Sequence, residues 1–294
     1  MVDTIFRTDL ALERQEILGN KSSPGIYSET ESKENVQITR IRVQTDEAEK
    51  QLSKPKGKYI TLQMPPLSGE AELFDGRLDA LTKEIESLLP KDGTILVVGL
   101  GNEQITPDAL GPKAVSYIFA TRHIPTELAK TLGFEKLRSV AGIAPGVLGQ
   151  TGIETGEIIR GVADRIKPSA VITVDALASR SLKRLGSTVQ ICDTGISPGS
   201  GVGNARKRLY KDNLGVKFIS IGVPTVVDGA TLAHNLIDKE KSSSFSILPE
   251  SEKMMVTPKE IDLLIEHASK LVGMAINCAL QKNMSAEDIL SLVS

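Results

Sequence analysis

Two aspartates occupy positions at which an α/β fold would bring their carboxylates together. Asp108 lies in the loop after the apolar run Ile95–Gly101, and Asp175 directly follows the apolar run Ala170–Val174. Ligands and catalytic groups gather at the carboxyl ends of strands in open α/β sheets, so both carboxylates are expected to face one crevice. In such a pair one carboxyl can take a proton from water while the other donates one, which is aspartic-type peptide hydrolysis. On spacing alone, the favoured interpretation is that each aspartate caps the helix that follows it.

Two further motifs carry residues that other protein classes use. The tripeptide Asp193–Gly195 occurs at the active sites of pepsin-like proteases, but those enzymes are all-β and this chain has no second copy. A turn is therefore favoured there. Gly199, Gly201 and Gly203 match neither a dinucleotide fingerprint nor a phosphate-binding P-loop. Their N–H groups could form an oxyanion-binding or substrate-binding loop beside the crevice.

The signals for a metal or for redox chemistry are weak. His234 is the one histidine expected near the crevice, and its spacing from Asp108 and Asp175 is unspecific for a metal site. We therefore expect no metal and no cofactor. Cys192 and Cys278 belong to no Cys-x-x-Cys motif or Cys/His cluster, which argues against zinc and against a disulfide framework. A reducing compartment fits this cysteine usage.

Strands that alternate with helices are expected to position these residues. Short continuous apolar runs, typical of strands buried in a parallel sheet, occur at Ile95–Gly101, Ala170–Val174, Thr188–Cys192 and Val216–Gly222. Thr151–Glu154 has the pattern of a capping box before a helix that ends at Lys167, and Thr257–Glu260 is expected to cap a long C-terminal helix. The pattern predicts βαβ crossovers and a sheet covered by helices on both sides.

Composition narrows the class of protein. The 294 residues include 35 Lys and Arg against 37 Asp and Glu, a net charge of −2, which predicts neither direct nucleic-acid binding nor membrane binding. Aromatic residues make up 3% of the chain and there is no Trp, which argues against base-stacking surfaces. The start lacks the pattern of a secretory signal, and no run of about 18 apolar residues occurs. We expect a soluble cytoplasmic protein.

Polarity divides the chain unevenly along its length. Residues 1–58 are polar and poorly periodic, and a Ser- and Lys-rich stretch lies over residues 239–254. We expect a single α/β domain over residues 10–294, with a polar N-terminal subdomain over 10–70 and a short surface loop at 239–254.

Seven blocks of sequence, in order over nearly the whole chain, resemble the germination protease family of spore-forming Firmicutes. These blocks are Arg7–Ala11, Val97–Asn102 with Thr106–Pro112, Thr151–Glu154, Val174–Ser181, Pro198–Asn204, Pro224–Asp228 and Met255–Glu260. The resemblance implies an endopeptidase that starts the degradation of small acid-soluble, DNA-coating proteins in the spore core at germination. It also implies a three-layer α/β/α sandwich with a mostly parallel sheet, similar to the hydrogenase maturation proteases.

The resemblance further implies an atypical aspartic mechanism in which Asp108 and Asp175 are the catalytic residues. Family members are made as inactive precursors, assemble as homotetramers and remove a short N-terminal propeptide by self-cleavage. The corresponding bond here is Asp9–Leu10, which makes residues 1–9 a propeptide-like arm. Family members carry a longer insertion where this chain has only Lys241–Met254, so any role of that insertion in assembly or gating is in doubt for this chain.

Two alternative functions remain open on the sequence. One is a metal-sensing maturation protease of the hydrogenase-maturation type, whose carboxylates hold a metal of the substrate precursor. The other is a non-catalytic spore binding protein on the same fold. If the chain is a zymogen, the arm up to Leu10 could occupy the crevice or hold the two carboxylates apart.

Overall fold

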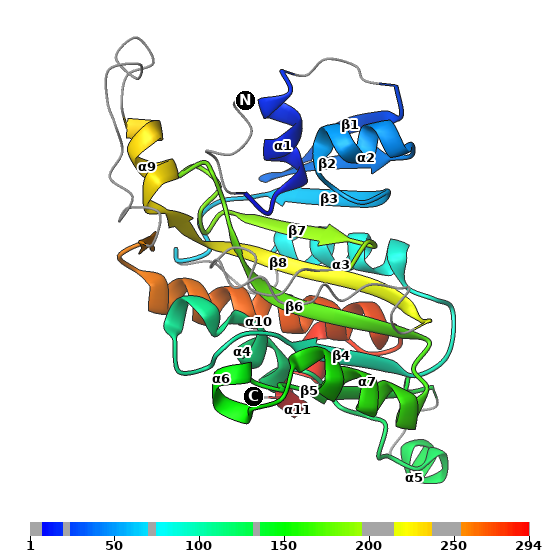
Figure 1. Ribbon diagram of the computed structural model, residues 1–294. Coiled ribbons are helices and arrows are strands. Elements are labelled where there is room, and N and C mark those ends of the chain that lie inside the picture. Colours follow the sequence, from blue (N-terminus) through cyan, green and yellow to red (C-terminus); the bar gives the residue numbers. More distant parts are fainter. Residues whose placement is uncertain are drawn as a thin grey trace.

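A mixed sheet with helices on both faces forms the body of the protein in the computed structural model (Figure 1). The structure describes residues 8–19, 24–69, 75–131, 136–195, 215–236 and 254–293. In these ranges the strands are β1 (Ile26–Lys33), β2 (Val36–Val43), β3 (Gly57–Gln63), β4 (Ile95–Gly99), β5 (Val140–Ile143), β6 (Ala170–Ala178), β7 (Thr188–Cys192), β8 (Lys217–Asp228) and β9 (Met255–Val256). Their order is β1-β2-β3-β7-β8-β6-β4-β5, and β9 pairs with β8.

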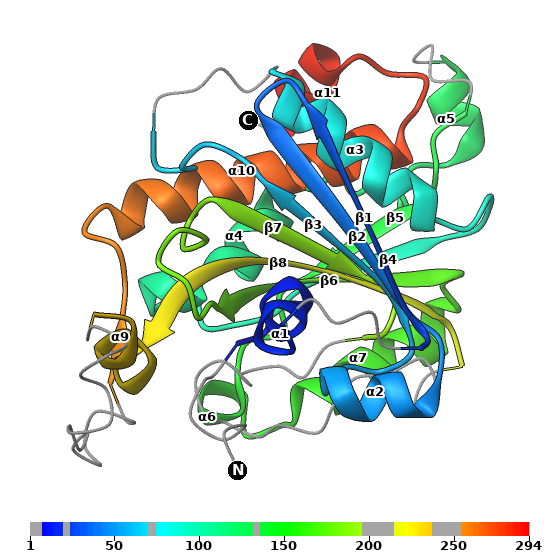
Figure 2. The same cartoon turned by 90° about the horizontal axis from the view of Figure 1, so that it is seen from above.

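The helices cover the two faces of this sheet in separate groups. They are α1 (Ala11–Ile17), α2 (Asp46–Leu52), α3 (Gly76–Leu88), α4 (Leu110–Ser116), α5 (Thr126–Thr131), α6 (Leu148–Thr151), α7 (Thr155–Ile166), α9 (Gly229–Leu236), α10 (Ile261–Leu280) and α11 (Ala286–Val293). Figure 2 shows α3, α10 and α11 on one side of the sheet and α1, α2 and α7 on the other. The apolar side chains under α3, α4 and α10 form the largest core cluster of the described residues. The predicted α/β fold is confirmed.

Strand direction divides the sheet into two parts. β4 pairs in parallel with β5 and β6, and β6 pairs in parallel with β8. The other part of the sheet is antiparallel: β1 pairs with β2, β2 with β3, β3 with β7, and β7 with β8. Because β3 pairs with β7, the polar N-terminal region shares this sheet, although the limits at residues 10 and 70 stay a prediction.

Two expected helix caps are wrong. Thr151 ends α6 and its hydroxyl donates to the Val147 carbonyl, so it is not available to cap the next helix. α7 begins after Glu154 without a side-chain cap. The long C-terminal helix likewise begins after Glu260 without a side-chain cap, not at Thr257. Both helices therefore begin several residues later than the capping patterns predict, at Thr155 and at Ile261.

Helix α10 is the central helix of the larger core. Among the described helices it is the only one long and apolar enough to cross a membrane, by length and composition alone. However, 72% of its most apolar window is buried inside the protein, against neighbours that include α3 and α4. These properties are those of a core helix.

Both cysteines are free thiols; Cys192 is buried and Cys278 is half-buried. Burial raises the pKa of Cys278 to about 11 and also raises the pKa of the buried Cys192. The raised pKa values leave little of either thiol ionised at pH 8, and the thiolate is the reactive form. We therefore expect iodoacetamide to label the folded protein slowly at pH 8 and both cysteines to react quickly in denaturant, as followed by intact mass. Fast labelling of either thiol in the folded protein would contradict this burial.

Candidate active site

Strand β6 carries Asp175 in the middle of the sheet. The strand does not end at Val174, as the apolar run predicts, but continues to Ala178 because β8 pairs with it along this whole length. Asp175 therefore lies within β6, opposite Gly222 of β8, and is only 4% exposed. Its Oδ1 accepts a hydrogen bond from the N–H of Ala176 at 2.9 Å.

Asp108 ends a short 3₁₀ helix, Thr106–Asp108, in the loop that follows β4. Its Oδ2 accepts a hydrogen bond from the N–H of Asn102 at 2.8 Å, which closes the loop on itself. The Thr225 hydroxyl of β8 donates to the Pro107 carbonyl at 2.8 Å. The Asp108 carboxylate is therefore held by the backbone of its own loop, and the loop is tied to β8 through Pro107.

A backbone hydrogen bond connects the surroundings of the two aspartates. The N–H of Leu100, directly after β4, donates to the carbonyl of Val174, directly before Asp175, at 2.8 Å. Since β4 and β6 are parallel neighbours, the loop that carries Asp108 leaves the sheet at the edge that β6 also approaches. Asp108, in the loop after β4, and Asp175, within β6, thus lie in one region beside the carboxyl end of β4.

Two glycines allow this close approach of backbone segments. A Cβ atom at Gly101 would lie 2.0 Å from the Asp108 carbonyl oxygen, and the φ of +114° at Gly101 disfavours any other residue. A Cβ atom at Gly111, in the first turn of α4, would lie 2.4 Å from the Val174 carbonyl oxygen. The Asp108 loop therefore packs backbone against backbone beside β6, with no side chain between them at these positions.

The segment before α1 adds to the end of β6. The N–H of Asp9 donates to the Ala178 carbonyl at 2.9 Å, and the N–H of Ala178 donates to Oδ2 of Asp9 at 2.9 Å. Leu10 is fully buried. The predicted cleavage bond, Asp9–Leu10, is thus fixed near the carboxyl end of the strand that carries Asp175, whereas residues 1–7 of the arm lie outside the described residues.

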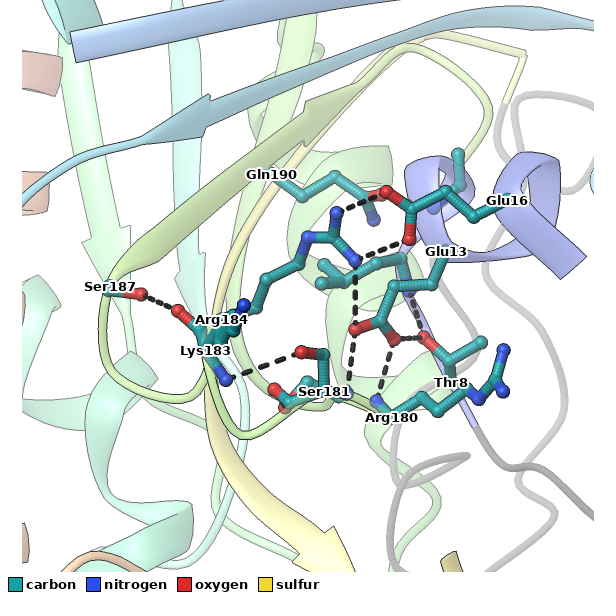
Figure 3. A network of polar contacts seen from close by, with 12 residues as sticks. Thr8, Glu13, Glu16, Arg180, Ser181, Lys183, Arg184, Ser187 and Gln190 are labelled. Atoms are coloured by element: carbon teal, nitrogen blue, oxygen red, sulfur yellow. Dashed lines mark hydrogen bonds and ion pairs between the residues drawn. The ribbon is translucent and has the colours of Figure 1, made fainter. Parts of the chain in front are cut away.

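A buried carboxylate, Glu13 of α1, holds the loop that leaves β6 (Figure 3). Its oxygens accept hydrogen bonds from the N–H groups of Arg180 and Ser181 at 2.6 and 2.8 Å, from Arg184 Nη1 at 3.3 Å and from the Thr8 hydroxyl. Glu13 is 1% exposed. The sequence analysis missed this residue, because its partners in the β6 loop lie some 170 positions away and no local pattern marks it.

We expect Glu13→Ala to destabilise the fold by about 2–5 kcal/mol, because it leaves the backbone N–H groups of Arg180 and Ser181 without their acceptor, while Arg184 keeps its ion pair with Glu16. Urea unfolding followed by circular dichroism would measure the change. Asp164→Ala removes a carboxylate from an exposed pair with Lys167, at 4.0 Å, and should change stability by less than about 1 kcal/mol. Equal losses in the two variants would contradict this interpretation of the network.

The Asp193–Gly195 tripeptide forms a turn that fastens β7 to β3. Asp193 Oδ1 accepts a hydrogen bond from the N–H of Lys58 at 2.7 Å, and the Asp193 N–H donates to the Lys58 carbonyl at 3.2 Å. The backbone bends at Asp193 and Thr194, at the place where the sequence favours a turn. This carboxylate therefore has a structural partner in the sheet.

The remaining predicted site residues are not described in enough detail to be placed. Gly199, Gly201 and Gly203 lie outside the described residues, as does most of the 239–254 loop. His234 belongs to α9, but its side chain is also outside the described part. Within the described ranges there is no group of three or more His, Cys, Asp or Glu side chains that could hold a metal ion.

An α/β fold with two carboxylates at the carboxyl edge of its sheet has the layout of an α/β enzyme or ligand-binding protein. Comparison with known families makes this assignment specific. The sequence profile of the germination proteases matches residues 6–240. The chain belongs to the germination protease family, and is therefore a peptidase of spore germination.

The similarity to individual relatives extends over almost the full chain. A germination protease of Caldanaerobacter subterraneus subsp. tengcongensis is 44% identical, with 98% of each chain covered. One from Clostridium perfringens is 41% identical over 96% of this chain and 97% of its own. One from Bacillus pumilus is 35% identical over 97% and 95%. The family resemblance predicted from the sequence blocks is confirmed.

Among solved structures, a [NiFe] hydrogenase maturation protease, HycI, from Thermococcus kodakarensis is similar to this chain. The two share 19% sequence identity and superpose with a TM-score of 0.35, covering 66% of this chain and 98% of the other.

Proposed function

We propose that this protein is an endopeptidase that starts the degradation of small acid-soluble DNA-binding proteins in the spore core, and that Asp108 and Asp175 activate the attacking water. Relatives at 35 to 44% identity that carry the name germination protease support the peptidase class. One observation supports the catalytic pair: the hydrogen bond from Leu100 to Val174 joins the start of the Asp108 loop to β6 directly before Asp175.

The proposed chemistry needs no group beyond two carboxyls and water. One carboxylate takes a proton from water as the water oxygen attacks the scissile carbonyl carbon. The other, protonated, carboxyl donates a hydrogen bond to the carbonyl oxygen as negative charge develops there. The C–N bond then breaks, and the departing nitrogen takes a proton. The two groups titrate as a pair, so a pH–rate profile would report values for the dyad and not for either residue.

We further propose that the chain is made as an inactive precursor, assembles as a homotetramer and removes residues 1–9 by cleavage of the Asp9–Leu10 bond. The contacts of Asp9 with Ala178 support this choice of bond, because they hold the segment at the end of the catalytic strand. In this proposal, the arm keeps other peptides away from β6 until it is removed.

Incubation of the purified protein with a small acid-soluble spore protein tests the proposal. Mass spectrometry should detect specific fragments of the spore protein, together with a chain that begins at Leu10. Size-exclusion chromatography with light scattering should give the mass of a tetramer. Activity that is lost with a chelator and restored by a metal would favour a metal-dependent maturation protease. Absence of any cleavage would favour a non-catalytic binding protein.

A further inference from the structure

The main-chain carbonyl of Asp9 has two side-chain hydrogen-bond donors. Lys54 Nζ lies 2.8 Å from this oxygen and Gln190 Nε2 lies 3.0 Å from it. One donor is enough to satisfy a carbonyl that is removed from water, and the second one here is an ammonium group, whose charge strengthens the bond. Two converging donors, one of them cationic, polarise the carbonyl towards negative charge on oxygen.

This carbonyl belongs to the Asp9–Leu10 bond, and it lies on the face of the sheet from which Asp175 projects. Asp175 of β6 and Gln190 of β7 both pair with Gly222 of β8, so the three residues form one row across adjacent strands. Paired residues in a row project to the same face of the sheet. Strands lie about 4.8 Å apart, which puts the Cα atoms of Gln190 and Asp175 roughly 10 Å apart. Gly222 adds no side chain to this row; a Cβ there would meet the Leu177 side chain, 2.5 Å away.

The side-chain amide of Gln190 and the main chain of Lys54 are held in place before any reaction. Gln190 is 7% exposed, and its Oε1 accepts a hydrogen bond from the N–H of Ala11 at 2.7 Å, which fixes the direction of its amide group. Lys54 follows Ser53, the left-handed residue that ends α2, and its N–H donates to the Glu49 carbonyl at 3.3 Å. Donors that are already oriented are the requirement for stabilising charge that appears only during a reaction.

We propose that Lys54 and Gln190 form the oxyanion-binding site for self-cleavage at Asp9–Leu10, an inference that rests on the proposed function. The water oxygen bonds to the Asp9 carbonyl carbon, and a proton of the water passes to an active-site aspartate. The negative charge that develops on the carbonyl oxygen is stabilised by Lys54 Nζ and Gln190 Nε2. The C–N bond then breaks, the Leu10 nitrogen takes a proton, and Asp9 is left with a terminal carboxylate.

Two variants remove the donors one at a time with little change of shape. Lys54→Met keeps the length of the side chain and removes the ammonium. Gln190→Glu keeps an acceptor for the N–H of Ala11 and removes the donor to Asp9. Loss of one oxyanion donor slows acyl transfer by about 100- to 1,000-fold, so each variant should self-process that much more slowly. Lys50→Met, on the exposed side of α2, is the matched control and should process at the unaltered rate.

Intact mass measured over time at several protein concentrations gives the self-cleavage rate, and thermal unfolding shows whether each variant is folded. A second measurement reports on the carbonyl itself. The sequence contains only two Asp-Leu pairs, Asp9–Leu10 and Asp262–Leu263. Selective labelling with ¹³C-aspartate and ¹⁵N-leucine therefore gives two carbonyl signals, recorded in an uncleaved Asp175→Asn background. Lys54→Met should shift the Asp9 signal upfield and leave the Asp262 signal in place.

The outcomes separate this inference from the proposed function. Slow processing of both folded variants, together with the upfield shift, supports the oxyanion site. Processing at the unaltered rate in both variants overturns it and leaves the peptidase intact, as does self-cleavage at a different bond. An unchanged Asp9 signal in Lys54→Met overturns the polarisation on which the inference depends. A protein that cleaves neither itself nor a spore protein refutes the proposed function and the inference together.

Discussion

Replacement of Asp108 or Asp175 by asparagine is expected to abolish proteolysis of a spore protein while the fold stays intact. Asparagine has nearly the same shape and can still accept the hydrogen bonds from Asn102 and Ala176, but it can neither take nor give the catalytic proton. General acid–base catalysis contributes about 100- to 10,000-fold per group, so the rate should fall by at least this factor in each variant. Fragment yield by mass spectrometry measures the rate, and circular dichroism with thermal unfolding checks the fold.

Asp193→Asn is the matched control for both variants. Asparagine can still accept the hydrogen bond from the Lys58 N–H, so the contact between Asp193, directly after β7, and Lys58 of β3 should persist and activity should stay unaltered. Full activity in Asp108→Asn or Asp175→Asn would disprove the proposed dyad. Loss of activity in Asp193→Asn with a normal fold would instead implicate Asp193 in catalysis.

Gly101→Ala should cause a large loss of stability although it adds a single methyl group. The backbone at Gly101 has a φ of +114°, and the added Cβ would lie 2.0 Å from the carbonyl oxygen of Asp108. Strain at such a φ and overpacking against backbone each cost about 1–3 kcal/mol, so a loss of about 2–6 kcal/mol is expected in urea unfolding. Because the loop must shift to make room, the Asp108 carboxylate moves as well, and a displacement of about 1 Å can lower the rate by about 100-fold.

Gly161→Ala is the control for Gly101→Ala. Gly161 lies within α7, and a Cβ there would meet nothing within 4 Å. Alanine is favoured over glycine inside a helix by about 0.5–1 kcal/mol, so this variant should be more stable than the unaltered protein and equally active. If Gly101→Ala were as stable as Gly161→Ala, the close packing of the Asp108 loop on itself would be wrong.

Asp108 and Asp175 could be placed in one region from the sequence because each follows a continuous apolar run, and such a run predicts a buried strand of a parallel sheet. Both runs are strands, and both aspartates lie in the same region of the sheet. The predicted end of the second run was wrong because Ala176, Leu177 and Ala178 continue to pair with β8, and pairing with a distant strand has no local signature. A polar residue inside a buried strand therefore looked like the first residue of a loop.

The N-terminal strands were missed for a different physical reason. β1 is an edge strand, and all of its residues except the half-buried Ile26 are exposed, so its sequence Ile26–Lys33 lacks a hydrophobic pattern. β2 alternates between buried and exposed positions, but Thr39 and Arg40 interrupt the apolar residues. The interactions of Glu13 with the loop after β6 are likewise tertiary. Local patterns predict elements, whereas these contacts depend on which elements become neighbours.

If the proposed cleavage removes residues 1–9, the pairing of Asp9 with Ala178 has a further consequence. Ala178 is 1% exposed, and Asp9 now satisfies both its N–H and its carbonyl. Buried main-chain groups that lose such bonds are costly until something replaces them. Release of residues 1–9 would leave the N–H and the carbonyl of Ala178 without these partners at the end of β6. An extended polypeptide offers a carbonyl and an N–H that can pair with both groups. The N–H and carbonyl of Ala178, which bind Asp9 before cleavage, would then favour ligands that bind as an unfolded, extended strand.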